Sequence, residues 1–212
     1  MRAAVLTGVD QPLEILDLEV DQPRAHEVLI RTGAAGICHS DLHFAEGKYP
    51  CECPIVLGHE GAGVVEAVGA DVRYVAPGDH VITCVSMSCG ECRNCLRGRP
   101  HLCAHEGLVR DPEDTPRLSQ GGKRVHQLTE LSCYAEQMLV HEKAVVKVSR
   151  DLPLDRAALI GCAVTTGVGA AQNTAKIRPG DTVAVVGCGG IGLNAIQGAR
   201  IAGAERVIAV DR

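Results

Sequence analysis

The chain has 212 residues, 22% of them charged, and a formal net charge of −5, which is typical of a globular protein large enough to bury a core. The sequence has no run of about 20 apolar residues that could span a bilayer, and its N-terminus lacks the basic start and apolar stretch of a secretory signal. An aromatic content of 2% and the lack of a long basic run argue against nucleic-acid binding. We therefore expect a soluble cytoplasmic protein with neither a membrane nor a nucleic-acid partner.

Short apolar runs separated by glycine and proline fill the first 150 residues. The runs cover residues 3–6, 13–20, 27–37, 61–69, 79–85, 134–140 and 144–148. Many short runs with this punctuation predict a compact, β-rich, barrel-like domain. Between the fifth and sixth runs, residues 108–126 are expected to form a long loop.

The pattern changes after residue 150. Helices are predicted over residues 151–161 and 166–177, followed by a strand over 182–187, a helix over 191–204 and a strand over 206–210. The last three form a β-turn-α-β unit, which is typical of a parallel α/β sheet. We place the domain boundary after residue 163, giving domains 1–163 and 164–212. A doubly wound sheet has about six strands, so we expect the chain to be incomplete; the alternative, a genuine two-strand domain, would have a poorly supported sheet.

A dinucleotide motif, GCGGIG, joins the strand predicted over residues 182–187 to the helix predicted over 191–204. Gly187, Gly189 and Gly192 stand in the order G-x-G-x-x-G, and Asp211 ends the following strand. In this context the first glycine permits a tight turn, the second admits a pyrophosphate and the third allows close packing of helix and strand. Asp211 would accept hydrogen bonds from ribose hydroxyls, which favours NAD over NADP. The alternative is a glycine turn with only a packing role.

Four cysteines lie within the segment CGECRNCLRGRPHLC, at positions 89, 92, 95 and 103. Three interpretations compete: a structural zinc site, disulfides, or a reactive dithiol. A reducing compartment disfavours disulfides, and four thiolates saturate tetrahedral zinc. We therefore expect Cys89, Cys92, Cys95 and Cys103 to bind a zinc ion that stabilises the fold and does not catalyse.

Further metal-binding side chains lie upstream, in GICHSDLH and GHEGAG. They include Cys38 and His59, with Glu60 next to His59, and a third ligand can be sought at Cys162 near the domain boundary. Thiolate and imidazole are zinc ligands, and a catalytic site keeps one position open. By spacing alone each assignment is weak, because cysteine is often a buried small hydrophobe and a single histidine is often structural.

These motifs together resemble the zinc-dependent medium-chain alcohol dehydrogenases. The resemblance rests on GICHSD, GHEGAGVVEAVG, the four-cysteine segment, GCAVTTGVGA and VGCGGIG, and it covers essentially the whole chain. It is greatest to the class III-like bacterial members, because the lobe with four cysteines is present and the third ligand is Cys162. It implies an α/β protein with a β-rich GroES-like catalytic domain followed by the start of a Rossmann doubly wound parallel sheet.

The resemblance also implies a role for each matching residue. Cys38, His59 and Cys162 match the catalytic zinc ligands, and Glu60 matches an acidic neighbour that approaches the metal during ligand exchange. Asp41 matches a carboxylate that orients His59. Ser40 and His43 match a proton relay from the alcohol to solvent, while His39 and Thr166 match coenzyme contacts.

The implied function is hydride transfer from a primary or aromatic alcohol, or S-hydroxymethylglutathione, to NAD, giving an aldehyde, with one catalytic and one structural zinc. The alternative is a non-catalytic zinc-binding fragment or assembly module. Val85, Leu128 and Thr129 are expected to line the alcohol pocket, although no feature selects the substrate. The intact parent protein is expected to be a homo-oligomer. No role is assigned to Cys84, Cys133 and Cys188. Cys51 and Cys53 form a C-x-C pair for which extra metal binding is the alternative to the expected loop or packing roles. Ordinary surface or core roles are expected for His26, His80, His101, His105, His126 and His141.

Overall fold

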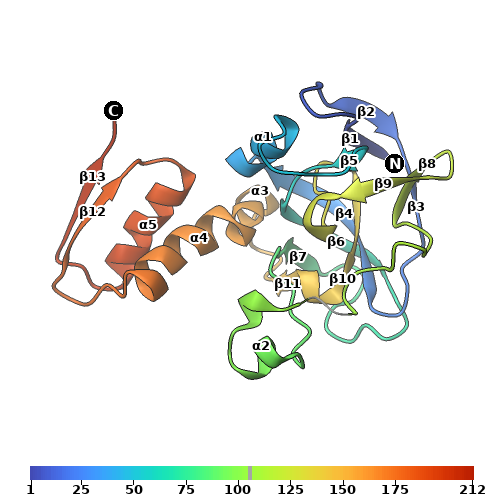
Figure 1. The fold of residues 1–212 in the computed structure, drawn as a ribbon. Helices are drawn as coiled ribbons and strands as arrows, with labels where there is room; N and C mark the ends of the chain where they lie inside the picture. Colours follow the sequence, from blue (N-terminus) through green and yellow to red (C-terminus); the bar gives the residue numbers. More distant parts are fainter. Residues whose placement is uncertain (105–106) are drawn as a thin grey trace. The chain divides into compact units, whose positions relative to one another are not determined.

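The structure, a computed structural model, describes residues 1–104 and 107–212 (Figure 1). His105, expected above to have an ordinary surface or core role, lies outside the described residues. The chain divides into two compact units, Met1–Ala158 and Leu159–Arg212. The boundary predicted after residue 163 therefore lies within the second unit.

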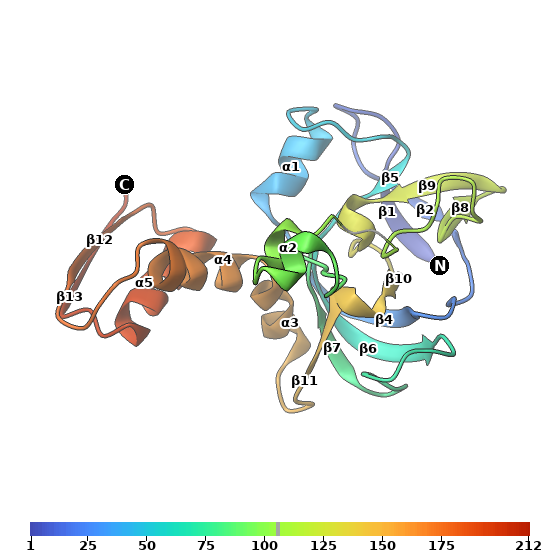
Figure 2. The same ribbon diagram turned by 60° about the horizontal axis from the view of Figure 1, so that its bottom comes forward.

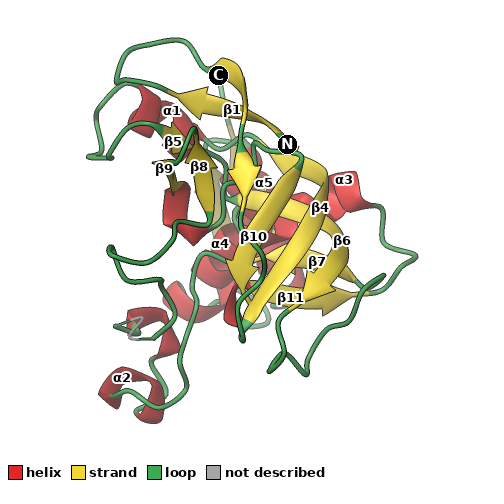
Figure 3. Cartoon of the chain, turned by 90° about the vertical axis from the view of Figure 1, so that its right-hand side faces the viewer, coloured by secondary structure: helices red, strands yellow, loops and turns green. Residues whose placement is uncertain are grey.

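A five-stranded antiparallel sheet forms one part of the first unit, with the order β10-β4-β6-β7-β11 (Figure 3). Its strands are β4 (Glu27–Gly36), β6 (Glu60–Val68), β7 (His80–Thr83), β10 (Gln137–His141) and β11 (Val145–Val148). The long strand β4 pairs with β6 and is interrupted by two register shifts, which bend the pair. All five strands fall on runs predicted from the sequence.

A second sheet of six strands has the order β2-β1-β5-β9-β8-β3. Its strands are β1 (Arg2–Leu6), β2 (Glu14–Asp17), β3 (Glu19–Val20), β5 (Ile55–Val56), β8 (Leu118–Gln120) and β9 (Lys123–Gln127). The prediction of a loop over residues 108–126 is wrong for its second half, where β8 and β9 form a hairpin. These strands are too short for a sequence alternation to separate them from a loop.

The interior of the first unit is made of aliphatic side chains from both sheets. The larger cluster includes Val28, Ile30, Val81, Met138 and Val140, each no more than 1% exposed. Cys89 and Cys103 pack against the edge of this cluster, so the cysteine-rich segment is attached to the core at both of its ends. That segment contains the short helix α2 (Arg93–Leu96) and a 3₁₀ turn over Pro100–Leu102.

Helix α1 (His39–Ala45) follows Cys38 and precedes the GHEGAG motif. Two further helices lie near the predicted domain boundary: α3 (Leu154–Ala157) and α4 (Ala163–Gly169), which is continued by a π-helical turn over Ala170–Thr174. Helix α1 was not among the predicted elements because its seven residues, HSDLHFA, include only three apolar ones, too few to give a helical period. None of the helices in the described ranges has both the length and the hydropathy needed to cross a bilayer.

The second unit contains the predicted β-turn-α-β arrangement. Strands β12 (Thr182–Val186) and β13 (Arg206–Val210) pair in parallel, and α5 (Gly190–Ile201) connects them and packs along the pair (Figure 2). The predicted fold class is thus confirmed: a β-rich first part is followed by a parallel βαβ unit.

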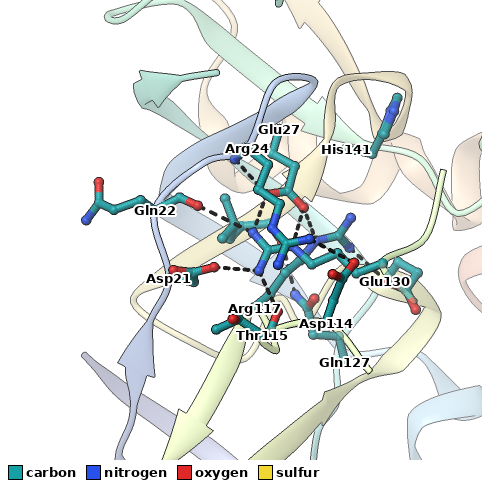
Figure 4. A network of polar contacts seen from close by, with 12 residues as sticks. Asp21, Gln22, Arg24, Glu27, Asp114, Thr115, Arg117, Gln127, Glu130 and His141 are labelled. Carbon is teal, nitrogen blue, oxygen red and sulfur yellow. Dashed lines mark hydrogen bonds and ion pairs between the residues drawn. The ribbon is translucent and has the colours of Figure 1, made fainter. Parts of the chain in front are cut away.

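A buried network of charges joins the N-terminal segment to the hairpin region of the first unit (Figure 4). Glu27, 5% exposed, accepts hydrogen bonds from Arg117 Nε at 2.7 Å and from Arg110 Nε at 2.8 Å. Arg110 also bonds Asp21, and Arg117 also bonds Glu130. Burial alone would raise the pKa of Glu27, but hydrogen bonds from Arg110, the Arg24 backbone and Arg117 lower it from 4.5 to about 2. The network therefore ties residues more than 80 positions apart in the sequence.

Replacing Glu27 by glutamine is expected to destabilise the protein, because it leaves two buried guanidinium groups without their shared carboxylate. Removing one partner of a buried ion pair typically costs about 3 kcal/mol or more. Calorimetric unfolding at pH 7 measures this as a lower melting temperature. The control is Glu136→Gln, which breaks the exposed pair with Arg2 and is expected to leave the melting temperature within error.

The same comparison across pH is expected to identify the charge of Glu27 as the cause. A carboxylate whose pKa is depressed on folding stabilises the native state above its unfolded pKa and loses that contribution as the pH falls through the folded pKa. The difference between the wild type and Glu27→Gln should therefore be constant above about pH 4.5 and shrink toward about pH 2. A difference that does not depend on pH would contradict this account.

Candidate functional site

The four cysteines of the lobe are brought together by the fold. Their sulfurs lie 3.5 Å (Cys92 to Cys95), 3.6 Å (Cys89 to Cys103) and 3.9 Å (both Cys89 to Cys95 and Cys92 to Cys103) apart. Four sulfurs placed about 2.3 Å from a tetrahedral zinc would be separated by about 3.8 Å. The donor set and its spacing therefore fit a zinc ion with four thiolate ligands.

Backbone geometry prepares this cluster for a metal. The N–H of Cys92 points at Cys89 Sγ and the N–H of Cys89 points at Cys103 Sγ, each at 3.3 Å. Hydrogen bonds from the backbone of Cys95 and Ala104 lower the pKa of Cys92 to about 6, whereas burial raises the pKa of Cys95 to about 12, so Cys92 ionises before Cys95. All eleven cysteines of the chain are described as reduced thiols, and none forms a disulfide.

The second cluster lies between the start of α1 and the start of β6. Cys38, His59 and Glu60 each offer a ligand atom, and these atoms lie within 4.8 Å of one another. His59 and Glu60 are buried, at 6% and 3% exposure, while Cys38 is half-buried. Because a thiol, an imidazole and a carboxylate converge here, the first unit presents a set of possible metal ligands.

Asp41 holds this cluster together. Its Oδ1 accepts hydrogen bonds from the N–H of Gly58 at 3.0 Å and lies 3.2 Å from His59 Nδ1. Its Oδ2 accepts from the N–H of Cys38 at 3.1 Å and from Tyr134 Oη at 3.0 Å. The contact expected between Asp41 and His59 is therefore present, and it leaves His59 Nε2 for a metal.

The electrostatics of the cluster follow from these contacts. The hydrogen bond to Asp41 raises the pKa of His59 to about 9, against the opposing effect of burial. Burial raises the pKa of Cys38, but hydrogen bonds from Ser40 and the charge of His59 outweigh it, so the net shift is downward. Burial likewise raises the pKa of Asp41, and its contacts with His59 and Tyr134 reverse that shift. The contacts thus favour the charged forms of Cys38, Asp41 and His59, and a metal bound at His59 Nε2 would displace its proton.

Strand pairing fixes the backbone around His59. Thr83, fully buried at the end of β7, accepts a hydrogen bond from the N–H of Gly61 at 2.9 Å. Its hydroxyl also lies 3.4 Å from the carbonyl oxygen of His59. Neither Thr83 nor Tyr134 was predicted as a site residue, because each acts through a neighbour distant in sequence and no local motif marks it.

The candidate proton-relay residues stand on α1. Ser40 Oγ lies 3.6 Å from Cys38 Sγ, which places the hydroxyl beside the metal-ligand cluster. The ring of His43, one turn further along, stacks edge-on against His39 and Tyr49, with centroids 4.6 and 5.2 Å away. Ser40 and His43 are three residues apart and hence share a face of the helix.

Leu128 and Thr129, predicted to line the alcohol pocket, border a cavity of about 420 Å³. Phe44, Cys51 and His126 are among its other lining residues. Val85, the third predicted lining residue, is not among them; it packs against the core instead.

The glycine motif of the second unit forms the turn between β12 and α5. Gly187 has φ +92°, which a residue with a side chain rarely adopts. A Cβ on Gly192 would lie 1.8 Å from the carbonyl oxygen of Gly187, whereas nothing lies within 4 Å of one on Gly189. Asp211 Oδ2 accepts a hydrogen bond from the N–H of Cys188 at 2.6 Å, so the carboxylate is held against the turn.

The remaining predicted residues also belong to the second unit. Cys162 directly precedes α4, and Thr166 lies within that helix, where its N–H bonds the carbonyl of Cys162 at 2.9 Å. Their roles as a metal ligand and a coenzyme contact stay predictions.

Comparison with known proteins adds independent findings. The family model described as the alcohol dehydrogenase GroES-like domain matches residues 24–150. The chain is 46% identical over 213 residues to an NDMA-dependent alcohol dehydrogenase of Amycolatopsis methanolica, and the match covers 99% of this chain and 57% of that protein. It is 45% identical over 217 residues to an S-(hydroxymethyl)glutathione dehydrogenase of Haemophilus influenzae, with coverage of 99% and 57%.

Among solved structures, the benzyl alcohol dehydrogenase of Acinetobacter calcoaceticus superimposes with a TM-score of 0.89 at 36% identity. That superposition covers 99% of this chain and 58% of the other. The chain therefore spans little more than half the length of the relatives it matches.

Replacing Cys92 by alanine is expected to remove one zinc ion per chain and to lower the melting temperature, because three thiolates bind zinc less tightly and the lobe loses its cross-link. Metal content by atomic absorption and unfolding by circular dichroism measure the two effects. Cys84→Ala, a cysteine outside both clusters, is the matched control and is expected to keep the wild-type zinc content. A Cys92→Ala protein with unchanged zinc content would contradict the assignment.

Proposed function

Because the chain belongs to the alcohol dehydrogenase GroES-like domain family, we propose that it provides the catalytic domain of an NAD- and zinc-dependent alcohol dehydrogenase, together with the start of its coenzyme domain. The observation that carries the proposal is the convergence of Cys38, His59 and Glu60 beside the hydroxyl of Ser40. This arrangement combines metal ligands with a group that can move a proton.

The donor chemistry fits zinc at both clusters. The four thiols of the lobe have the spacing of a closed tetrahedral site, which supports the fold. At the second cluster, Cys38 and His59 are proposed as ligands, Cys162 as the third, and Glu60 as the acidic neighbour. Zinc bound there would supply a Lewis acid that lowers the pKa of an alcohol.

The residues of α1 are proposed to handle the alcohol proton. Ser40 accepts the proton from the alcohol oxygen and passes it toward His43, which lies one turn along the same helix and reaches solvent. Asp41 does not take part in proton transfer, because both of its oxygens are occupied by hydrogen-bond donors. It orients His59 instead.

The second unit is proposed to bind NAD. The open space at Gly189 allows a pyrophosphate to approach the backbone, and the N-terminus of α5 supplies N–H donors. Asp211, at the end of β13, would accept hydrogen bonds from the ribose and repel a 2′-phosphate. His39 and Thr166 are proposed as further coenzyme contacts.

The substrate is proposed to be a primary or aromatic alcohol, or S-hydroxymethylglutathione, with oxidation to the aldehyde. The names of the relatives support this range, since one is a benzyl alcohol dehydrogenase and another an S-(hydroxymethyl)glutathione dehydrogenase. Homo-oligomerisation of the full-length protein and a cytoplasmic location stay predictions, the first from the family resemblance and the second from the sequence.

The full-length protein is expected to form NADH from NAD in an alcohol-dependent reaction that a chelator abolishes. Cys38→Ala is expected to reduce kcat/KM by at least about 100-fold, because metal ligands contribute more than the 10- to 100-fold typical of their supporting residues. The variant should keep its melting temperature and lose only one of two zinc ions.

Cys92→Ala serves as the contrast, since it is expected to lose stability more than activity per folded molecule. The reverse pattern, a stable and inactive Cys92→Ala with an active Cys38→Ala, would show that the two sites have been exchanged. A protein that binds zinc but oxidises nothing in a substrate panel, including formaldehyde with and without glutathione, would favour the non-catalytic zinc module.

A further inference from the structure

The segment that contains Tyr134 is fixed on both sides by main-chain hydrogen bonds. The N–H of Tyr134 bonds the carbonyl of Leu57 at 3.1 Å, and its own carbonyl accepts from the N–H of Ala4 at 2.8 Å. The preceding residue, Cys133, donates its N–H to the carbonyl of Gly58 at 2.9 Å. The tyrosine therefore has a well-defined place beside the residue that precedes His59.

The ring of Tyr134 packs directly on Gly58. A Cβ at Gly58 would lie 2.6 Å from Tyr134 Cδ1, and the φ of Gly58 is +89°. Both facts require glycine at this position, because a side chain would clash with the ring and would disfavour the backbone conformation. The close contact fixes the backbone at Gly58, and this backbone places His59 in the cluster with Cys38 and Glu60.

The hydroxyl of Tyr134 donates the fourth hydrogen bond to the carboxylate of Asp41. Each oxygen of this carboxylate has two donors: Gly58 and His59 at Oδ1, Cys38 and Tyr134 at Oδ2. Three of these donors come from residues 38–59, whereas the tyrosine lies 93 positions away from Asp41 in sequence. A hydrogen bond to an ionised acceptor is about twice as strong as one between neutral groups, so this contact restrains the carboxylate from outside its own segment.

We propose that Tyr134 is a positioning residue for the metal site: its hydroxyl fixes Asp41, and Asp41 in turn fixes the ring of His59. The inference rests on the proposed function in that this site is taken to hold zinc. Without the hydroxyl, Oδ2 loses one of the two donors found for it among the described residues, and the carboxylate gains freedom to turn away from His59. Supporting groups of this kind hold metal ligands in orientation and raise their basicity.

Tyr134→Phe tests the proposal, because it removes one oxygen and keeps the ring that packs on Gly58. The zinc-loaded full-length protein is mixed with a chelating dye, and the release of zinc from the two sites is followed over time. The variant is expected to release one zinc ion about ten-fold faster than the wild type and the other zinc ion at an unchanged rate. A ten-fold change lies within the range typical for residues that hydrogen-bond to metal ligands. With cobalt(II) in place of zinc, the visible absorption of the His59 site is expected to shift.

Tyr74→Phe is the matched control in the same unit. Its hydroxyl accepts a hydrogen bond from the N–H of Lys147 at 3.1 Å, so this variant also removes one hydrogen-bonded hydroxyl from the first unit. Both release rates and the cobalt spectrum should remain those of the wild type.

A double-mutant cycle separates positioning from a general loss of stability. In the Asp41→Asn background, Tyr134→Phe is expected to change zinc release by less than two-fold, because the route through the carboxylate is already disrupted. The same ten-fold effect in both backgrounds, or wild-type release and spectrum in Tyr134→Phe alone, would overturn the proposal. Failure of the wild type to bind any metal through Cys38 and His59 would instead overturn the proposed function.

Discussion

The candidate catalytic site depends on one buried carboxylate, that of Asp41. It accepts donors from the start of α1, from Gly58 and His59 before β6, and from Tyr134 before β10. An ionised carboxylate is stable at 4% exposure only when its oxygens are satisfied in this way. The arrangement therefore works in both directions: the donors keep Asp41 charged, and Asp41 holds the donors, including a metal ligand, in place.

Two kinds of metal site are built differently by this chain. The four-cysteine cluster is local, since all its ligands lie within residues 89–103 and two of them are supported by short backbone contacts within the same segment. The cluster at His59 joins segments that are distant in sequence and relies on sheet pairing, the Thr83 hydroxyl and the Asp41 carboxylate for its geometry. A closed local site suits a structural metal, while a site supported by many elements can keep one face open for a reactant.

The buried ion network around Glu27 complements this arrangement at another place in the first unit. Its two arginines come from the segment between α2 and β9, where the sequence contains few apolar residues that could attach the chain by packing. The charged contacts of Arg110 and Arg117 there add to the burial of Leu108 and Leu118. Such networks are less a source of net stability than a means of specifying one arrangement, because each charge is costly to bury without its partner.

The sequence alone determined the order and type of the longer elements, since hydrophobic runs bounded by glycine and proline report strands directly. It also determined the βαβ glycine motif and the four-cysteine ligand set, because in both the chemistry lies within one short segment. Strands β5, β8 and β9 could not be predicted, because each has only two to five residues. A strand this short is stabilised by the strands that it pairs with, and its own sequence pattern does not mark it. Likewise, only the tertiary structure placed Tyr134 beside Asp41 and Thr83 beside His59. Their contacts join residues 93 and 24 positions apart, and such contacts depend on how the sheets close, which no local spacing encodes.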